Sequence, residues 1–295
     1  MRHAIRISIV CLLWLSAGAA AAQTTPAAAA APQSGSNDFL RIAKNAAGEP
    51  RAFQTSIVHL APDSASISRV TVDLVAAVHI GDARYYEELN ARFRDYDSVL
   101  YELVAPQGTR VPLGGGPRRS LVSSVQSGMT DVLGLAFQLE KIDYTRPNFV
   151  HSDLSPDEMA RSMAERGESA ADYLWKAMGV SLNEQAKDPF GLQGFAMLVA
   201  LLSPDRERLL KIQLASSMLN LDQITAVIEG KEGSSLIGER NKRAVTVLED
   251  RIRRGDKRIA IFYGAAHMTD MAKRIESELG LRRVGSEWLD AWDLR

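Results

Sequence analysis

Ala76-Ala77-Val78-His79-Ile80-Gly81-Asp82 has the same layout of small, apolar, His and Asp residues as a second stretch near the other end of the chain, Gly264-Ala265-Ala266-His267-Met268-Thr269-Asp270. Each copy follows an apolar run that is typical of a β-strand and precedes an apolar spacing that is typical of a helix. In open α/β sheets, ligands bind at the edge formed by the carboxyl ends of the strands. The repeat therefore predicts that His79 and His267 lie together at one such edge.

The segments around the two copies predict an α/β fold with a mixed central sheet flanked by helices. It is expected to have two pseudo-symmetric halves, each with the order strand, [GA]xxH motif, helix, strand. The first two strands are expected to pair as a hairpin. The expected elements are strands at 52–60, 68–78 and 99–104 with a helix at 83–93 in the first half, and a helix at 244–252, a strand at 258–263, a helix at 271–279 and a strand at 281–288 in the second.

A long segment between the halves, residues 107–235, is expected to be a mainly helical insertion. Inserted helices at the ligand edge of a sheet often act as lids or specificity walls. The alternative is that they only cover a face of the sheet. The helices expected in this insertion lie near 119–139, 156–166, 170–178, 190–202 and 204–219.

The N-terminus has the pattern of a secretory signal peptide. Arg2 and Arg6 precede an apolar stretch at 7–15, and Ala20-Ala21-Ala22 before Gln23 forms a small-residue cleavage site. We expect a signal peptide at 1–22, a disordered Ala- and Pro-rich linker at 23–38 and a single domain at 39–295. The protein is then periplasmic or secreted.

Composition excludes several classes of site. Loss of the signal peptide removes Arg2 and Arg6 and moves the formal charge from −1 to −3, which argues against a nucleic-acid partner. Cys11 is the only cysteine and leaves with the signal peptide, so the mature chain has no disulfide, cysteine–zinc site or cysteine nucleophile. The apolar stretch at 190–202 is too short to span a bilayer, and no transmembrane span is expected in the mature chain. The oligomeric state stays open.

Glu102 is the third informative residue, because it interrupts the otherwise apolar strand expected at 99–104. A buried carboxylate needs a cation or strong hydrogen-bond donors, and strand order places Glu102 at the same edge as His79. The alternative is a glutamate on the solvated face of an edge strand. Together with His267, these residues form a sufficient protein shell for a catalytic divalent metal, which is left open among Mn, Co, Zn and Fe.

The other polar residues of interest have structural interpretations. Asp82 and Asp270 are expected to cap the helices that follow the two motifs. His151 and the two residues after it are either an additional ligand or base from the insertion, or a loop before the Ser155 helix cap, which we favour. His59 is expected to be structural.

These residues together resemble the TraB/GumN (PrgY) family, in a superfamily with the Tiki metalloproteases, the erythromycin esterases and the ChaN haem-binding proteins. The resemblance is carried by the paired motifs, by Tyr101-Glu102-Leu103 and by Arg240-Asn241 at the start of a helix. It spans most of the mature chain, is strongest in 70–106 and 236–293, and is diffuse in the insertion.

The resemblance implies a mixed α/β sheet with His79, Glu102 and His267 around a catalytic centre. It implies that Arg240 and Asn241 give polar support or anchor the substrate. Ala76 departs from the pattern, since the first motif normally has glycine there. Its methyl group is expected to narrow the approach to the site.

The leading hypothesis is an exported metal-dependent hydrolase that acts on peptide or amide bonds, with a peptide or small molecule as substrate. In one alternative, a metal-free esterase-type hydrolase, a histidine is the general base and Glu102 orients it or shares its proton. In another, the same histidines bind haem, a metal or a signalling peptide without turnover.

Overall fold

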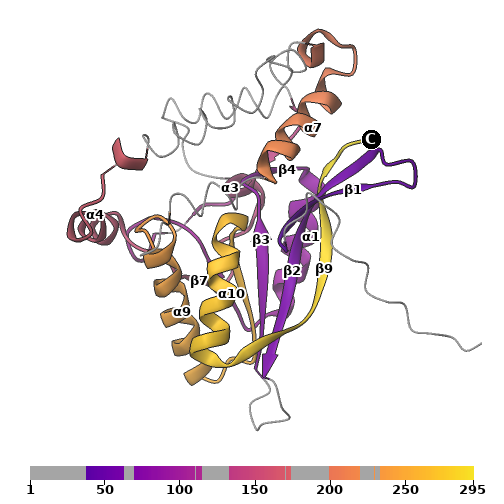
Figure 1. Ribbon diagram of the computed structural model, residues 1–295. Coiled ribbons are helices and arrows are strands. Elements are labelled where there is room, and N and C mark those ends of the chain that lie inside the picture. The colour runs from indigo at the N-terminus through magenta and orange to yellow at the C-terminus, as the bar shows by residue number, and fades with distance from the viewer. Residues whose placement is uncertain are drawn as a thin grey trace, which may run out of the picture. The chain divides into compact units, whose positions relative to one another are not determined.

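A mixed β-sheet with helices on both faces organises the protein (Figure 1). The computed structural model describes residues 38–62, 70–109, 111–114, 133–169, 171–173, 199–219, 229 and 233–295. All of them belong to one compact unit, Ser34–Arg295. The expected signal peptide and nearly all of the expected linker lie outside the described residues. No helix within the described part of the chain is long and apolar enough to cross a membrane.

The sheet confirms the α/β class that the sequence predicts. Its strands follow the order β1-β2-β3-β8-β5-β7, with β9 paired to β2. The expected hairpin is formed by the antiparallel pair of β2 and β3, whereas β3, β8, β5 and β7 are parallel. The strands are β1 Leu40–Lys44, β2 Pro50–Pro62, β3 Thr71–Ala77, β5 Ser98–Tyr101, β7 Phe149–His151, β8 Arg258–Gly264 and β9 Leu281–Asp293.

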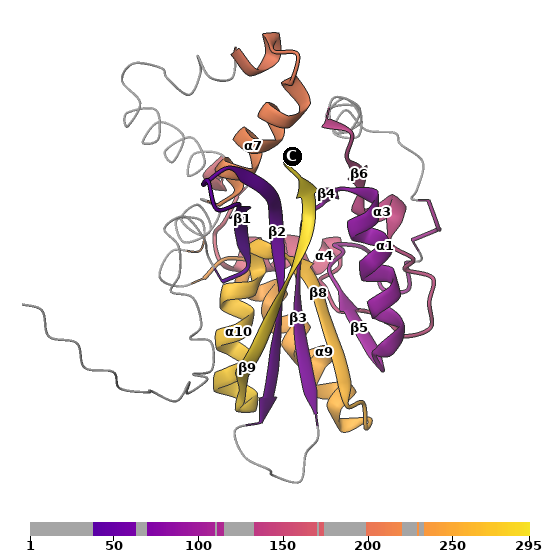
Figure 2. The ribbon, with the colours of Figure 1, turned by 90° about the vertical axis from the view of Figure 1, so that its right-hand side faces the viewer.

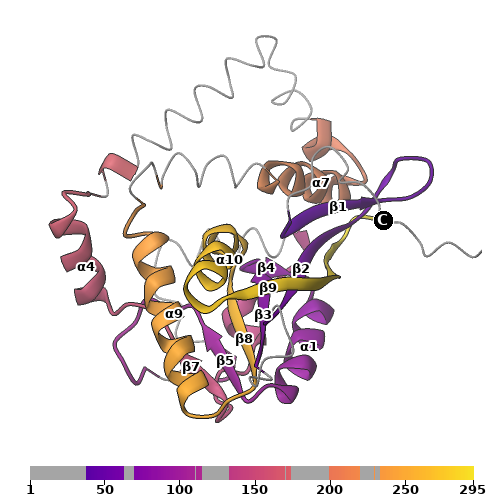
Figure 3. The same cartoon turned by 60° about the horizontal axis from the view of Figure 1, so that its bottom comes forward.

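The parallel strands at the centre are apolar because helices cover both of their faces. Strands β3, β5 and β8 consist almost entirely of buried residues, as is usual for parallel sheets. Helices α9 (Gly238–Arg253) and α10 (Ala265–Leu279) lie on one face, and α1 (Ala83–Arg92), continued by η1 (Phe93–Asp95), lies on the other (Figures 2 and 3). Both halves have the expected strand, helix and strand, β3, α1 and β5 and then β8, α10 and β9, but they are not symmetric. His267 lies inside α10, and β9 is antiparallel beside β2, whereas β5 is parallel beside β8.

Helix α10 begins six residues before the expected start, so the expected role of Asp270 as an N-cap is wrong. Gly264 occupies the N-cap position, and Asp270 lies inside the helix. The alanines after Gly264 are good helix formers, which explains the early start. The side chain of Asp82 also fails to act as expected. Within the described residues it makes no capping hydrogen bond, and it accepts one from the backbone of Asp293 at 2.6 Å.

The insertion supplies part of the sheet as well as helices. Strand β7 extends the parallel sheet beside β5, and β6 (Ala136–Phe137) pairs with β4 (Ile80–Gly81) just after His79. Helices α4 (Pro156–Glu165) and α7 (Arg206–Met218) confirm two of the expected helices. At the end of the helix expected near 119–139, the structure instead has strand β6, followed by the short helix α3 (Gln138–Lys141). Most of the expected helices near 119–139, 170–178 and 190–202 lie outside the described residues.

Glu168 anchors the segment after α4 to the start of α9. Its carboxylate accepts hydrogen bonds from Arg166 Nε at 2.9 Å, the Tyr173 hydroxyl at 2.6 Å and Ser235 N at 3.0 Å. Burial alone would raise the pKa of Glu168, but these hydrogen bonds outweigh it and lower the pKa to about 2. The folded state therefore favours the ionised carboxylate.

We expect the change Glu168→Gln to flatten the acid limb of the pH–stability curve. The pKa of Glu168 rises towards 4.5 on unfolding, so its contribution is complete above that pH and is lost as the pH falls towards 2. The contribution amounts to about 3 kcal/mol at neutral pH. Urea unfolding at a series of pH values measures it, with the exposed Glu165→Gln as control. Curves for Glu168→Gln and wild type that stay parallel from pH 2 to pH 7 would contradict this assignment.

Candidate functional site

The structure brings His79, Glu102 and His267 to one point, the backbone at Gly264. A Cβ atom added to Gly264 would lie 3.2 Å from Glu102 Oε2, 3.9 Å from His79 Nε2 and 3.9 Å from His267 Cδ2. The topology explains this, because β8 lies between β3 and β5 in parallel, so the carboxyl ends of all three strands meet. Glycine leaves the space between the three side chains open.

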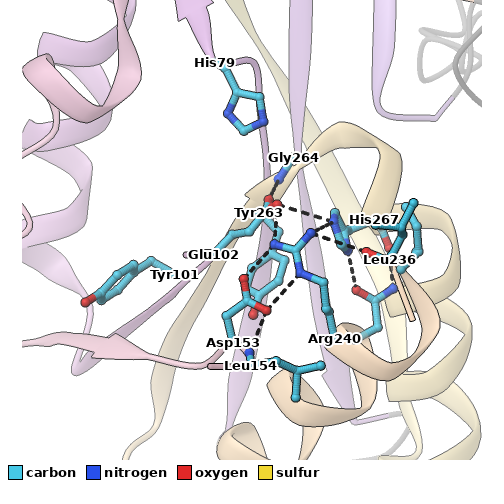
Figure 4. A network of polar contacts seen from close by, with 12 residues as sticks. His79, Tyr101, Glu102, Asp153, Leu154, Leu236, Arg240, Tyr263, Gly264 and His267 are labelled. Carbon is cyan, nitrogen blue, oxygen red and sulfur yellow. Dashed lines mark hydrogen bonds and ion pairs between the residues drawn. The ribbon is translucent and has the colours of Figure 1, made fainter. Parts of the chain in front are cut away.

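Glu102 lies directly after β5 and holds a buried negative charge. Strand β5 pairs with β8 on one side and β7 on the other, so the alternative of a glutamate exposed on an edge strand is wrong. The side chain is 13% exposed. Its Oε2 accepts a hydrogen bond from Gly264 N at 2.7 Å, and its Oε1 accepts one from Arg240 Nη2 at 2.7 Å (Figure 4).

The surroundings of Glu102 keep it ionised. Burial alone would raise the pKa of this carboxyl. Interactions with His267, Arg240 and His79 outweigh burial and hold the pKa well below its usual range. The site therefore presents a carboxylate, not a carboxylic acid, at neutral pH.

Arg240, on α9, links Glu102 to a second buried carboxylate. Its Nε and Nη2 donate to Asp153 Oδ1 and Oδ2 at 2.9 and 2.6 Å, and the Asp153 side chain is fully buried. Burial alone would lower the pKa of Arg240, but Asp153 and Glu102 raise it above its usual value. Arg240 Nη1 also lies 3.4 Å from His267 Nε2. The guanidinium thus connects β5, the segment after β7, and the first turn of α10.

Asn241 fixes which nitrogen of His267 faces the site. Asn241 Nδ2 donates to the carbonyl of His267 at 3.0 Å and to Asp270 Oδ2 at 2.8 Å, and both of these partners are acceptors. The amide oxygen must then point to His267 Nδ1, 2.7 Å away, and accept its proton. The neutral ring then carries its lone pair on Nε2, which faces the donor Arg240 Nη1 at 3.4 Å.

His79 is held in a similar way from the insertion. Its Nδ1 lies 3.2 Å from the amide oxygen of Gln138, and its Nε2 would lie 3.9 Å from a Cβ atom at Gly264. In Figure 4, His79 stands beside Gly264, next to the network of Glu102, Arg240 and His267.

Other residues singled out from the sequence lie outside this cluster. His151 is the last residue of strand β7 and not part of the loop that we favoured, and its Nε2 lies 2.6 Å from the carbonyl oxygen of Leu103. His59, on β2, contacts Asp73 of the neighbouring strand at 2.8 Å. Ala76 is fully buried in the core, where its carbonyl accepts a hydrogen bond from Tyr85. Its methyl group therefore packs in the core, and the expectation that it narrows the approach to the site is not supported.

Sequence reasoning considered Asp153 only within the polar cluster that begins at His151, for which it favoured a loop, and it missed Gln138. Asp153 follows β7 as Glu102 follows β5, so strand order alone would have placed both acids at one edge had β7 been recognised. Gln138 lies at the end of a segment expected to be helical, and no residue pattern marks it. Its position comes from the pairing of β4 with β6.

The donor chemistry of the cluster suits a divalent metal, although the side chains are not gathered around one. Within the described ranges, no three His, Cys, Asp or Glu side chains are placed so that they could hold an ion as they stand. Arg240 contacts Glu102 and His267, two of the three side chains that would be ligands of the ion. Two imidazole Nε2 atoms and one carboxylate are nevertheless the ligand types of catalytic zinc, manganese and iron sites.

No protein-family model, curated protein or solved structure matches the chain.

We expect Asp153→Asn to destabilise the protein by about 3 kcal/mol, because it leaves the buried charge of Arg240 with one partner fewer. Asparagine keeps the size of the side chain, so packing changes little. The free energy of unfolding, measured in urea, gives the effect. The exposed Asp95→Asn is the control and should change stability by less than about 0.5 kcal/mol. A loss at Asp153 no larger than that of the control would show that the pair is not formed.

Proposed function

We propose that the protein is a hydrolase that cleaves amide or peptide bonds, with His79, Glu102 and His267 at its centre. The observation that supports this most is the meeting of two imidazoles and an ionised carboxylate around the side-chain-free Gly264. Such a set can activate water and manage the proton transfers of hydrolysis.

We also propose that the chain is a member of the TraB/GumN family. The residues that carry the resemblance in sequence meet around Gly264, where His79 lies beside the bonded network of Glu102, Arg240-Asn241 and His267. Their convergence supports the resemblance, because these residues come from distant parts of the chain.

Charge balance supports a cation at this centre. Glu102, Asp153 and Arg240 form a buried group of two carboxylates and one guanidinium, with one negative charge in excess. Buried excess charge is costly unless it is paired, and the imidazole lone pairs beside it also attract positive charge. We propose that His79, Glu102 and His267 hold a divalent metal ion, which when bound supplies activation of water and polarisation of a carbonyl.

The chain's own residues prepare the reaction in definite ways. Arg240 and the Gly264 amide keep Glu102 ionised and fixed, and Asn241 keeps the Nε2 lone pair of His267 directed into the site. His267 is thus prepared to accept a proton at Nε2 if it is not a metal ligand. Asp153 holds Arg240 by two hydrogen bonds and prevents it from swinging away.

A metal-free hydrolase is the second candidate, and the position of Arg240 favours it. The guanidinium already supplies positive charge to Glu102 at 2.7 Å and lies 3.4 Å from His267 Nε2. With this arrangement, His267 would be the general base and Glu102 would stabilise its protonated form.

Metal content and turnover, measured together, test the proposal. We expect protein purified without a chelating column to carry about one divalent ion per chain, as catalytic sites of this ligand type do. The His79→Ala/His267→Ala double variant should lose the ion and the hydrolysis of amide and ester substrates. His59→Ala, which removes an imidazole outside the cluster, should keep both.

The outcomes separate the candidates. Equal metal content in wild type and double variant would overturn the metal site. Turnover that survives exhaustive chelation but is lost in the double variant would select the metal-free hydrolase. Hydrolysis that is unchanged in the double variant would overturn both.

We further propose that the protein acts outside the cytoplasm. Arg2, Arg6, the apolar stretch at 7–15 and the alanines before Gln23 support a cleaved signal peptide. The lack of any cysteine after residue 22 suits an oxidising compartment, because no thiol is left to be modified there.

A further inference from the structure

We propose that Gln138 is a positioning residue that fixes the tautomer of His79, as Asn241 does for His267. Its effect on catalysis rests on the proposed function. Its effect on the imidazole does not, because a tautomer can be measured in a protein that has no known activity.

The backbone brings Gln138 to His79 and holds it there. Strand β4 starts directly after His79 and pairs with β6, with Ile80 opposite Phe137. The pairing is continued by a hydrogen bond from Gln138 N to the carbonyl of His79 at 2.9 Å. The side chains of His79 and Gln138 therefore lie next to each other. Gln138 is only 5% exposed, so few alternative partners can reach its amide.

The amide of Gln138 has a partner at each end. Its Nε2 donates to the hydroxyl of Tyr144 at 2.9 Å, and its Oε1 faces His79 Nδ1 at 3.2 Å. With this orientation, Gln138 Oε1 accepts a proton from Nδ1, and the neutral His79 has its lone pair on Nε2.

The two motifs are therefore supported by the same chemistry from different parts of the chain. His267 Nδ1 is bonded to the amide of Asn241 on α9, and His79 Nδ1 to the amide of Gln138 in the insertion. Both rings then present an Nε2 lone pair near Gly264, which either metal binding or general base catalysis requires. The opposite tautomer of His79 would place a hydrogen atom on Nε2 and prevent both.

The insertion consequently has a role in the site beyond covering it. Gln138 lies at the start of α3, directly after the strand that pairs with β4. A change in this segment that moved Gln138 would alter the chemistry of His79 without touching either histidine motif.

Nuclear magnetic resonance of the full chain with ¹⁵N-labelled histidine tests the proposal, because long-range couplings identify the protonated ring nitrogen. At a pH where the imidazoles are neutral and with no metal added, we expect the Nδ1–H tautomer for both His79 and His267 in wild type. Gln138→Leu should shift His79 to the Nε2–H form or to a mixture, whereas Gln138→Glu, which keeps an acceptor, should retain Nδ1–H. The signals of His267 serve as an internal control for correct folding.

The matching experiment changes Asn241, with His79 as the internal control. Asn241→Leu should change the tautomer of His267 and leave the tautomer of His79 unchanged. Finding His79 in the Nε2–H form in wild type would overturn the proposal, as would an unchanged tautomer in a folded Gln138→Leu variant. If Gln138→Leu does not fold, the tautomer of His79 in wild type and in Gln138→Glu decides.

Activity gives an independent measure. If the proposed hydrolysis is found, we expect Gln138→Leu to lower kcat by about ten- to a hundredfold, the usual effect of removing a group that supports a ligand histidine. Gln138→Glu should restore most of it. If Gln138→Leu changes the tautomer of His79 but the wild-type protein hydrolyses no substrate, the positioning role of Gln138 is supported and the proposed function is overturned.

Discussion

The structure of the site depends on one buried ion cluster, in which Arg240 is shared by Asp153 and Glu102. Burying these charges is costly, and only mutual pairing offsets the cost. The pairing is bidentate towards Asp153 at 2.9 and 2.6 Å and continues to Glu102 at 2.7 Å. It fixes α9 against the ends of β5 and β7, and through His267 it also reaches α10. A hydrogen bond from Gly264 N to Glu102 Oε2, at 2.7 Å, also ties Glu102 to the start of α10, the helix that carries His267.

The parallel centre of the sheet makes this cluster possible. Strands β3, β8, β5 and β7 all end at the same edge, so the residues that follow them meet although they are far apart in the sequence. His79 follows β3, Gly264 ends β8, Glu102 follows β5, and Asp153 comes soon after β7. A glycine at the end of β8 leaves the space among them open, because any side chain there would lie 3.2 Å from Glu102 Oε2.

The sequence was sufficient for the parts of the site that rest on strand order. The repeated motif placed His79 and His267 at strand ends, and the lone acid in an apolar strand identified Glu102. These predictions needed only the rule that parallel strands end at one edge. The predicted start of α10 and the predicted capping role of Asp270 were wrong, because a helix can start at Ala265 without a polar cap when the alanines favour it.

The sequence was not sufficient where a partner is set by tertiary pairing. Gln138 reaches His79 through two short strands of two residues each, a length at which periodicity carries no signal. Asp153 was visible as a polar residue but not as part of the site, because strand β7 is only three residues long. Both residues lie in the insertion, which the sequence described least well and which supplies much of the support for the histidines and Arg240.

A double-mutant cycle between Glu102 and Arg240, read as the free energy of unfolding in urea, measures their pairing in the buried ion cluster. Glu102→Gln and Arg240→Met should each destabilise the protein, and the double variant should lose about 2 kcal/mol less than the sum of the two. Single effects that add within about 0.5 kcal/mol would show that the two groups do not interact, and would contradict the site as described.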